Sequence, residues 1–155
     1  MQEINFKDIN ALESKVSEDF GAWGTEIEVT QQLINDFADL TGDHQWIHVD
    51  VEKCAQMSPF GGPIAHGFLV LVLMPKLTLP EADYEIVGYG NIVNYGSDKL
   101  RFTGAVPAGS KLRMRGRIAA VEAKAKGTAV TMEMAIHVVG QDRPSVVYQM
   151  IMLYQ

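Results

Sequence analysis

Several features are scarce in this chain of 155 residues, and each scarcity excludes a class of protein. Cys54 is the single cysteine, which excludes an internal disulfide and suits a reducing compartment. The longest apolar run, residues 67–74, is far too short to span a bilayer. Lysine and arginine number 13 against 19 aspartate and glutamate residues, and the net charge of −6 argues against a general nucleic-acid binder.

The start of the chain also lacks a signal-peptide pattern, because the stretch MQEINFKDINALESK has no apolar segment between charged flanks. Hydrophobic residues make up 47% and charged residues 21%, so the chain is neither disordered nor a coiled coil. Its length fits one domain with a core of its own. We therefore expect a single domain over residues 1–155, located in the cytoplasm, that contacts neither membranes nor nucleic acid.

The first half of the chain predicts helices and loops. Residues 23–29 alternate apolar and charged side chains, which indicates a short strand. Thr30 can then cap a helix that carries one apolar stripe. The stripe consists of Leu33, Phe37 and Leu40. Gly42 is expected to end this helix in the left-handed conformation, so the residues after it are predicted to form a loop.

A second helix is predicted near Gly61-Gly62-Pro63, because proline suits a first helical turn. The residues that follow are apolar on every face up to Pro75, which predicts a helix that is buried all round. Strands are predicted over residues 84–93, 99–102, 111–121, 128–138 and 145–153, with a turn near Asn94-Tyr95-Gly96. The pattern favours an α+β fold in which an antiparallel sheet curls around the apolar helix.

A polar loop follows Gly42, with the sequence TGDHQWIHVD. Asp43 and His48 are five residues apart, so both can face one cavity and share a water molecule. A carboxylate and an imidazole placed in this way can divide the roles of base and acid near neutral pH. The alternative is that Asp43 forms a local turn and that His48 is an ordinary half-buried histidine.

Other chemistry finds less support in this loop. The possible metal ligands are Asp43, His44, His48, Asp50 and His66. However, the HExxH pattern and a second cysteine are absent, so we expect no metal. A GxSxG nucleophile motif is also absent.

The second informative motif is PFGGPIAHG, at the start of the apolar helix. Its glycines and proline leave backbone amides free, and such amides can stabilise a developing oxyanion. The alternative is that Gly61 and Gly62 form only a tight entry turn, with His66 as a capping or packing histidine.

Together, TGDHQWIHVD and PFGGPIAHG resemble the MaoC-like dehydratases, also called (R)-specific enoyl-CoA hydratases, and within them the nodulation protein N-like branch. The matching residues are Gly42, Asp43, His48, Asp50, Pro63, Ile64, His66 and Gly67. The later stretch NYGSDKLRFTGAVPAGSKL is also similar to that branch, so the resemblance covers about residues 20–155. The chain departs from the family at Gln45, usually asparagine, and at Trp46, usually proline.

The resemblance implies a hot-dog fold, in which an antiparallel sheet wraps a long central helix, and a homodimer. It also implies an acyl-CoA thioester substrate and reversible hydration of a trans-2-enoyl-CoA to an (R)-3-hydroxyacyl-CoA without a cofactor. By the same resemblance, Asp43 and His48 activate water and the Gly67 amide binds the thioester oxygen. Gln45, Ile64 and His66 complete the oxyanion and substrate-binding region.

Two other functions remain open at this point. A hot-dog thioesterase hydrolyses such substrates, but its acidic residue usually lies on or beside the central helix, and residues 67–74 contain no carboxylate. A non-catalytic acyl-thioester-binding module fits the fold but gives Asp43 and His48 no role.

Positive charge is concentrated in residues 99–126, which hold eight of the 13 lysines and arginines and one acidic residue, Glu122. This segment therefore carries +7 and the remainder −13. The asymmetry suggests a local anionic partner, and we expect Arg101 and Arg113 to bind the phosphates of CoA. The alternative is an ordinary solvated strand face.

Overall fold

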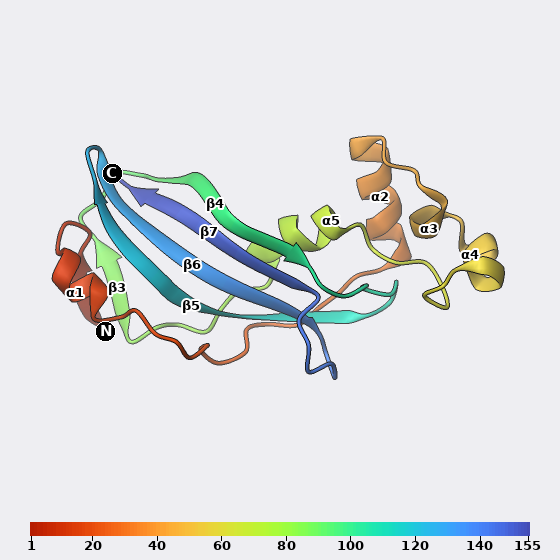
Figure 1. The fold of residues 1–155 in the computed structure, drawn as a ribbon, viewed down its shortest axis with the longest axis horizontal. Coiled ribbons are helices and arrows are strands. Elements are labelled where there is room, and N and C mark those ends of the chain that lie inside the picture. The colour runs from red at the N-terminus through yellow and green to blue at the C-terminus, as the bar shows by residue number, and fades with distance from the viewer.

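The computed structural model describes all 155 residues and contains a five-stranded antiparallel sheet (Figure 1). Its strands, in spatial order, are β2 (Ile27–Glu28), β5 (Lys111–Lys124), β6 (Gly127–Val138), β7 (Val146–Tyr154) and β4 (Ile92–Phe102). Strands β5, β6 and β7 form the expected meander, and β4 pairs with β7 at one edge. The strand predicted over residues 23–29 is shorter in the structure than expected, because only the two residues of β2, Ile27 and Glu28, pair with β5.

The strand predicted over residues 84–93 is divided in the structure, because residues 84–87 form β3 and β4 begins at residue 92. Strand β3 (Tyr84–Val87) ends at Gly88, whose φ of 83° turns the chain, and it pairs in parallel with β1 (Gln2–Asn5). Together with α1 (Ile9–Glu13), these strands lie at the end of the sheet that contains both termini (Figure 1). The turn predicted at Asn94-Tyr95-Gly96 lies inside β4, where the register shifts and a bulge absorbs the extra residue.

Helix α2 (Gln31–Thr41) is confirmed with both of its ends. The Thr30 hydroxyl oxygen accepts a hydrogen bond from the Leu33 N–H at 3.1 Å, and Gly42 follows the helix with a φ of 79°. The predicted stripe is only partly right, because the buried face is centred on Ile34 and Ala38, while Leu40 is 82% exposed. Leu40 belongs to the helical region that projects beyond the sheet (Figure 1).

The loop predicted after Gly42 is wrong beyond Gln45, because two short helices follow. They are α3 (Trp46–Val49) and α4 (Val51–Met57). The Asp50 side chain caps α4 by accepting a hydrogen bond from the Lys53 N–H at 3.0 Å. Gly42 therefore ends only α2, and Asp50 acts as a new N-cap residue at the start of α4.

The central helix α5 (Gly67–Val72) begins at Gly67 rather than at Gly61-Gly62-Pro63, and the 3-10 helix η1 (Met74–Lys76) follows it. Its buried face packs on the concave side of the sheet. The contacts form one core cluster that includes Leu69, Val70, Leu73, Leu112, Met114 and Ile136. The prediction that this helix is buried on every side is wrong. Phe68 is 60% exposed, on a side of α5 that the sheet does not cover. No helix is long and apolar enough to cross a membrane.

A charged network lies on the other face of the sheet. Glu133 is 6% exposed and accepts hydrogen bonds from Arg117 Nη2 at 2.9 Å and from Gln149 Nε2 at 2.6 Å. Burial alone would raise the pKa of Glu133, but the hydrogen bonds from Gln149 and Arg117 outweigh it, so the pKa of this carboxyl is lowered. Glu133 is therefore ionised at neutral pH and stabilises the folded state.

This network predicts a specific acid sensitivity. A lowered folded pKa gives stability that is present above the unfolded value of about 4.3 and is lost as pH falls through the folded pKa. Glu133→Gln should lower the free energy of unfolding by about 1–3 kcal/mol at pH 7 and weaken its decline below pH 4.3, measured by urea titration. The control is Glu18→Gln, a 96% exposed partner of Arg117, which should change neither quantity. An unchanged acid decline in Glu133→Gln would contradict the assignment.

Candidate active site

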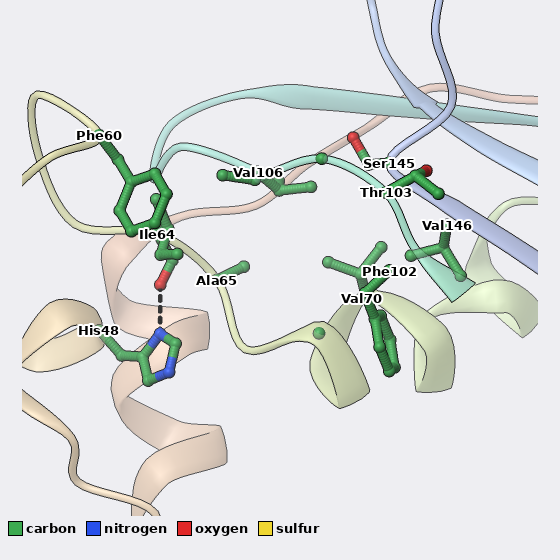
Figure 2. A pocket seen from close by; sticks show the side chains of 13 residues that line it. His48, Phe60, Ile64, Ala65, Val70, Phe102, Thr103, Val106, Ser145 and Val146 are labelled. Carbon is green, nitrogen blue, oxygen red and sulfur yellow. Dashed lines mark hydrogen bonds between the residues drawn. The ribbon is translucent and has the colours of Figure 1, made fainter. Parts of the chain in front are cut away.

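A cavity of about 360 Å³ lies where the helical region meets the sheet (Figure 2). Residues from distant parts of the chain line it, including His48 of α3, Gly67 of α5, Phe102 of β4, Val106 and Ser145. The cavity thus joins both sequence motifs to parts of the chain that carry no local motif.

His48 is held in one orientation by the backbone. Its Nδ1 lies 2.7 Å from the carbonyl oxygen of Ile64 (Figure 2), and because a carbonyl only accepts, Nδ1 carries the proton. The Nε2 atom therefore presents a lone pair. Burial, with the nearby His66 as a smaller cause, lowers the pKa of His48, so its imidazole is neutral at pH 7 and can accept a proton.

Asp43 follows the glycine that ends α2, in an exposed position. Its carboxylate accepts a hydrogen bond from the Gln45 N–H at 3.3 Å. Potential ligand atoms of Asp43, His48 and His66 all lie within 4.8 Å of one another. The structure thus brings together the two dyad residues that the sequence predicts, at a separation that one water molecule can bridge.

His66 connects the two members of the dyad. Its ring stacks on His48 with the centroids 3.9 Å apart and an interplanar angle of 26°. Its Nε2 donates to the backbone oxygen of Asp43 at 2.9 Å, while its Nδ1 is buried without a partner. The His66 side chain does not cap α5, so its observed role is to hold Asp43 beside His48.

The same three residues are the metal-ligating group that the chain offers. A metal ion lies near the ring plane of each imidazole that binds it, but the planes of stacked rings do not converge on one nearby point. The two other proposed ligands are engaged elsewhere, because His44 Nε2 bonds to Asp39 at 2.9 Å and Asp50 caps α4. The geometry is therefore better suited to proton transfer than to coordination.

Gly67 supplies a free backbone donor. As the first residue of α5, its N–H has no acceptor within the helix, and it makes no other hydrogen bond in the structure. A Cβ at this position would lie 2.8 Å from a ring carbon of Phe102, so only glycine fits without a shift. The N–H group of Gly67 can thus donate to an oxygen bound in the cavity.

The remaining predicted residues have different positions. Ile64 lines the cavity and anchors His48 through its carbonyl, and Gln45 precedes α3 as its N-cap residue. Arg113 lies between the core residues Leu112 and Met114 of β5, so its side chain is on the opposite face of the sheet. There its guanidinium lies 4.0 Å from the Trp23 ring centroid. Arg101 precedes the cavity-lining Phe102 on β4, so it faces the other side of the sheet. The structure does not bring these arginines to the dyad.

Sequence reasoning missed several cavity residues, among them Phe60, Phe102, Thr103 and Ser145. Phe60 stands in the motif PFGGPIAHG, and Phe102 and Thr103 stand in the stretch that resembles the family branch, but neither pattern marks these residues as part of a cavity. Two loops that are far apart in sequence bring Thr103 and Ser145 together. The pairing of β4 with β7, in which Phe102 lies opposite Val146, brings this part of the site together.

Known proteins share sequence similarity with this chain over most of its length. The family model described as "MaoC like domain" matches residues 22–139. The 3-hydroxyacyl-thioester dehydratase Z of Mycobacterium tuberculosis is 42% identical over 129 residues, which cover 83% of each chain. Nodulation protein N of Rhizobium leguminosarum bv. viciae is 36% identical and covers 100% of this chain and 94% of its own.

A solved structure confirms the hot-dog fold. The (R)-hydratase from A. caviae involved in PHA biosynthesis superposes with a TM-score of 0.68 at 20% identity. The match covers 90% of this chain and 98% of that chain.

The histidines should titrate differently. Burial lowers the pKa of His48, whereas the hydrogen bond to Asp39 raises the pKa of exposed His44. NMR titration should therefore find His48 below and His44 above the ordinary value of about 6.5. Asp39→Asn should return His44 towards that value and leave His48 unchanged. A His48 that titrates above 6.5 would contradict the lowered pKa that burial gives this histidine.

Proposed function

Because the chain belongs to the MaoC-like dehydratase family, we propose that it adds water reversibly to trans-2-enoyl-CoA and forms (R)-3-hydroxyacyl-CoA. The family and its dehydratase relative support a hydro-lyase. The observation that carries the proposal is that His48 and Gly67, with its free N–H, line one cavity, while the Asp43 carboxylate has an oxygen within 4.8 Å of a ring nitrogen of His48. These are a base, a second proton-handling group and an oxyanion donor.

In the proposed reaction the hydroxyl group of water adds to C3 and a proton adds to C2. The lone pair of His48 Nε2 favours this imidazole as the group that takes the water proton, with Asp43 holding the water. Charge then develops on the thioester oxygen, which the Gly67 N–H stabilises. The dyad returns a proton to C2, which completes the addition with no net change in the protein. No metal, flavin or nucleotide enters these steps.

The acyl chain is assigned to an apolar cavity of about 490 Å³ beside α5. Seven of its nine lining residues are hydrophobic, and four of them are methionines. The methionines are Met74, Met114, Met134 and Met150. Methionine side chains are flexible and fill irregular spaces, so this wall suits an aliphatic chain.

Loss of either dyad member should abolish most of the activity. Asp43→Asn and His48→Gln should each lower the rate of crotonyl-CoA hydration by at least about 10²-fold, followed by the loss of enoyl-thioester absorbance. His44→Gln is the matched control, because His44 lies in the same loop but bonds only to Asp39, and it should retain near wild-type turnover. Thermal unfolding should verify that each variant is folded. Wild-type turnover in His48→Gln would contradict the proposal.

The same preparations separate this function from its two alternatives. A thioesterase would release free thiol from crotonyl-CoA, although α5 offers no carboxylate for that chemistry. A binding module would bind the thioester without hydration or thiol release. Hydration without thiol release is the result that the geometry of Asp43 and His48 predicts.

The edge of the sheet supports a homodimer. Ten of the eleven residues of β4 are exposed and the strand has no partner beyond β7. The edge is apolar, with Ile92 40%, Val93 42% and Tyr95 57% exposed. Unpaired apolar edges favour pairing with another strand, so we propose that two copies of β4 meet at a twofold axis.

Light scattering at micromolar concentration should therefore give about 34 kDa, twice the chain mass of 17.1 kDa. Ile92→Lys with Tyr95→Lys should shift the mass towards that of a monomer, because two charges at the edge oppose pairing. Val16→Lys is the control, since Val16 is 39% exposed and lies outside β4. A wild-type monomer would rule out the proposed dimer.

A further inference from the structure

The base of the proposed reaction stands on a helix that is too short to hold itself in place. Helix α3 has four residues, and its local hydrogen bonds include those from the His48 N–H to Gln45 and from the Asp50 N–H to Trp46, both at 3.0 Å. A single helical turn is not stable alone, because the formation of the first turn is unfavourable. Contacts with other elements must therefore set the position of His48.

Gln31, the first residue of α2, supplies such a contact. Its Nε2 donates to the backbone carbonyl of His48 at 2.8 Å and to Asn35 Oδ1 at 3.0 Å. It is the one side chain that hydrogen-bonds to His48, since the other bonds of this residue go to the backbone carbonyls of Gln45 and Ile64. The Gln31 amide is thus held by its own helix and is bonded to the neighbouring α3 (Figure 1).

The orientation of this amide depends on what it donates. The Oε1 atom of Gln31 is buried without a hydrogen-bond partner, and the reverse orientation would place this oxygen against the carbonyl oxygen of His48. A buried oxygen without a partner costs free energy, and a methionine side chain of similar length would fill the same space without that cost. What the amide adds over a methionine is therefore its two N–H groups.

Through this bond, α2 supports both members of the dyad. The C-terminal end of α2 leads through Gly42 directly into Asp43, and Gln31 at its first residue binds the backbone of His48. Proton transfer depends steeply on geometry, and a misplacement of about 1 Å can lower a rate by about 10²-fold. The bond between α2 and α3 therefore bears directly on the separation of the carboxylate and the imidazole.

We propose that Gln31 is a positioning residue for His48, an assignment that rests on the proposed function. Gln31 does not line the cavity, and it acts by holding the His48 carbonyl and so the place of the imidazole beside Asp43. It lies outside both sequence motifs, so no local pattern marks it.

A substitution of similar size separates positioning from packing. Gln31→Met fills the same space but donates no hydrogen bond. It should lower kcat for crotonyl-CoA hydration by about 10-fold or more and leave the Kd of the unreactive butyryl-CoA unchanged. The matched control is Gln32→Met, because the amide of Gln32 bonds only to the exposed Asp36, at 2.7 Å, and this variant should change neither quantity. Thermal unfolding should verify that each variant is folded.

The variant Gln31→Glu adds a pH readout that packing alone would not change. The introduced carboxyl only accepts when it is ionised and can donate when it is protonated, and burial raises its pKa above the ordinary value of about 4.3. Its kcat relative to wild type at the same pH should therefore rise as pH falls from about 8 to about 5.5, because protonation restores a donor towards the His48 carbonyl. The same ratio for Gln31→Met should stay level.

Hydrogen exchange tests the bond without turnover. The backbone N–H groups of His48 and Asp50 should exchange about 10-fold faster in Gln31→Met and at the wild-type rate in Gln32→Met. Wild-type kcat in Gln31→Met, an equal loss in Gln32→Met, a level ratio in Gln31→Glu or unchanged exchange would each overturn the assignment. Faster exchange in Gln31→Met, with no hydration by the wild type, would count against the proposed function and not against the contact that holds His48.

Discussion

The site depends on the extended segment from Pro63 to Ala65, whose backbone is bonded on both sides. The Ile64 carbonyl accepts from His48 Nδ1, and the Ile64 N–H donates to Ile47 at 3.0 Å, which ties the segment to α3. On the other side Ala65 donates to Val106 at 2.8 Å and Pro63 accepts from Ala108 at 2.9 Å. Any movement of this segment would displace His48, the Gly67 amide and one cavity wall together.

Backbone carbonyls orient the two stacked histidines of the site, His48 and His66. Each ring donates one N–H to a carbonyl, of Ile64 for His48 and of Asp43 for His66. Burial keeps His48 neutral, and stacking on His66 fixes the ring plane. The dyad is thus preorganised before any substrate binds.

The two faces of the sheet carry different kinds of side chain. One face carries the apolar core and both cavities. The other face carries the arginines of β5, which stack on Phe20 and Trp23 or pair with Glu133. The excess of positive charge in residues 99–126 therefore belongs in large part to a structural layer on the face of the sheet away from the cavities.

Local chemistry in the sequence determined the ends of α2, the positions of β5, β6 and β7, the hot-dog fold by resemblance, and the choice of Asp43 and His48, which the structure brings together. Each of these depends on neighbours a few residues away: the Thr30 cap, the left-handed Gly42, strict alternation, or a short motif. Tertiary structure alone decided that β4 is one strand, that Phe68 is exposed, and that Ser145 and Phe102 meet at the cavity. The reason is that pairing and burial depend on partners about 40 or more residues distant, such as Phe102 and Val146, whose register no local pattern specifies.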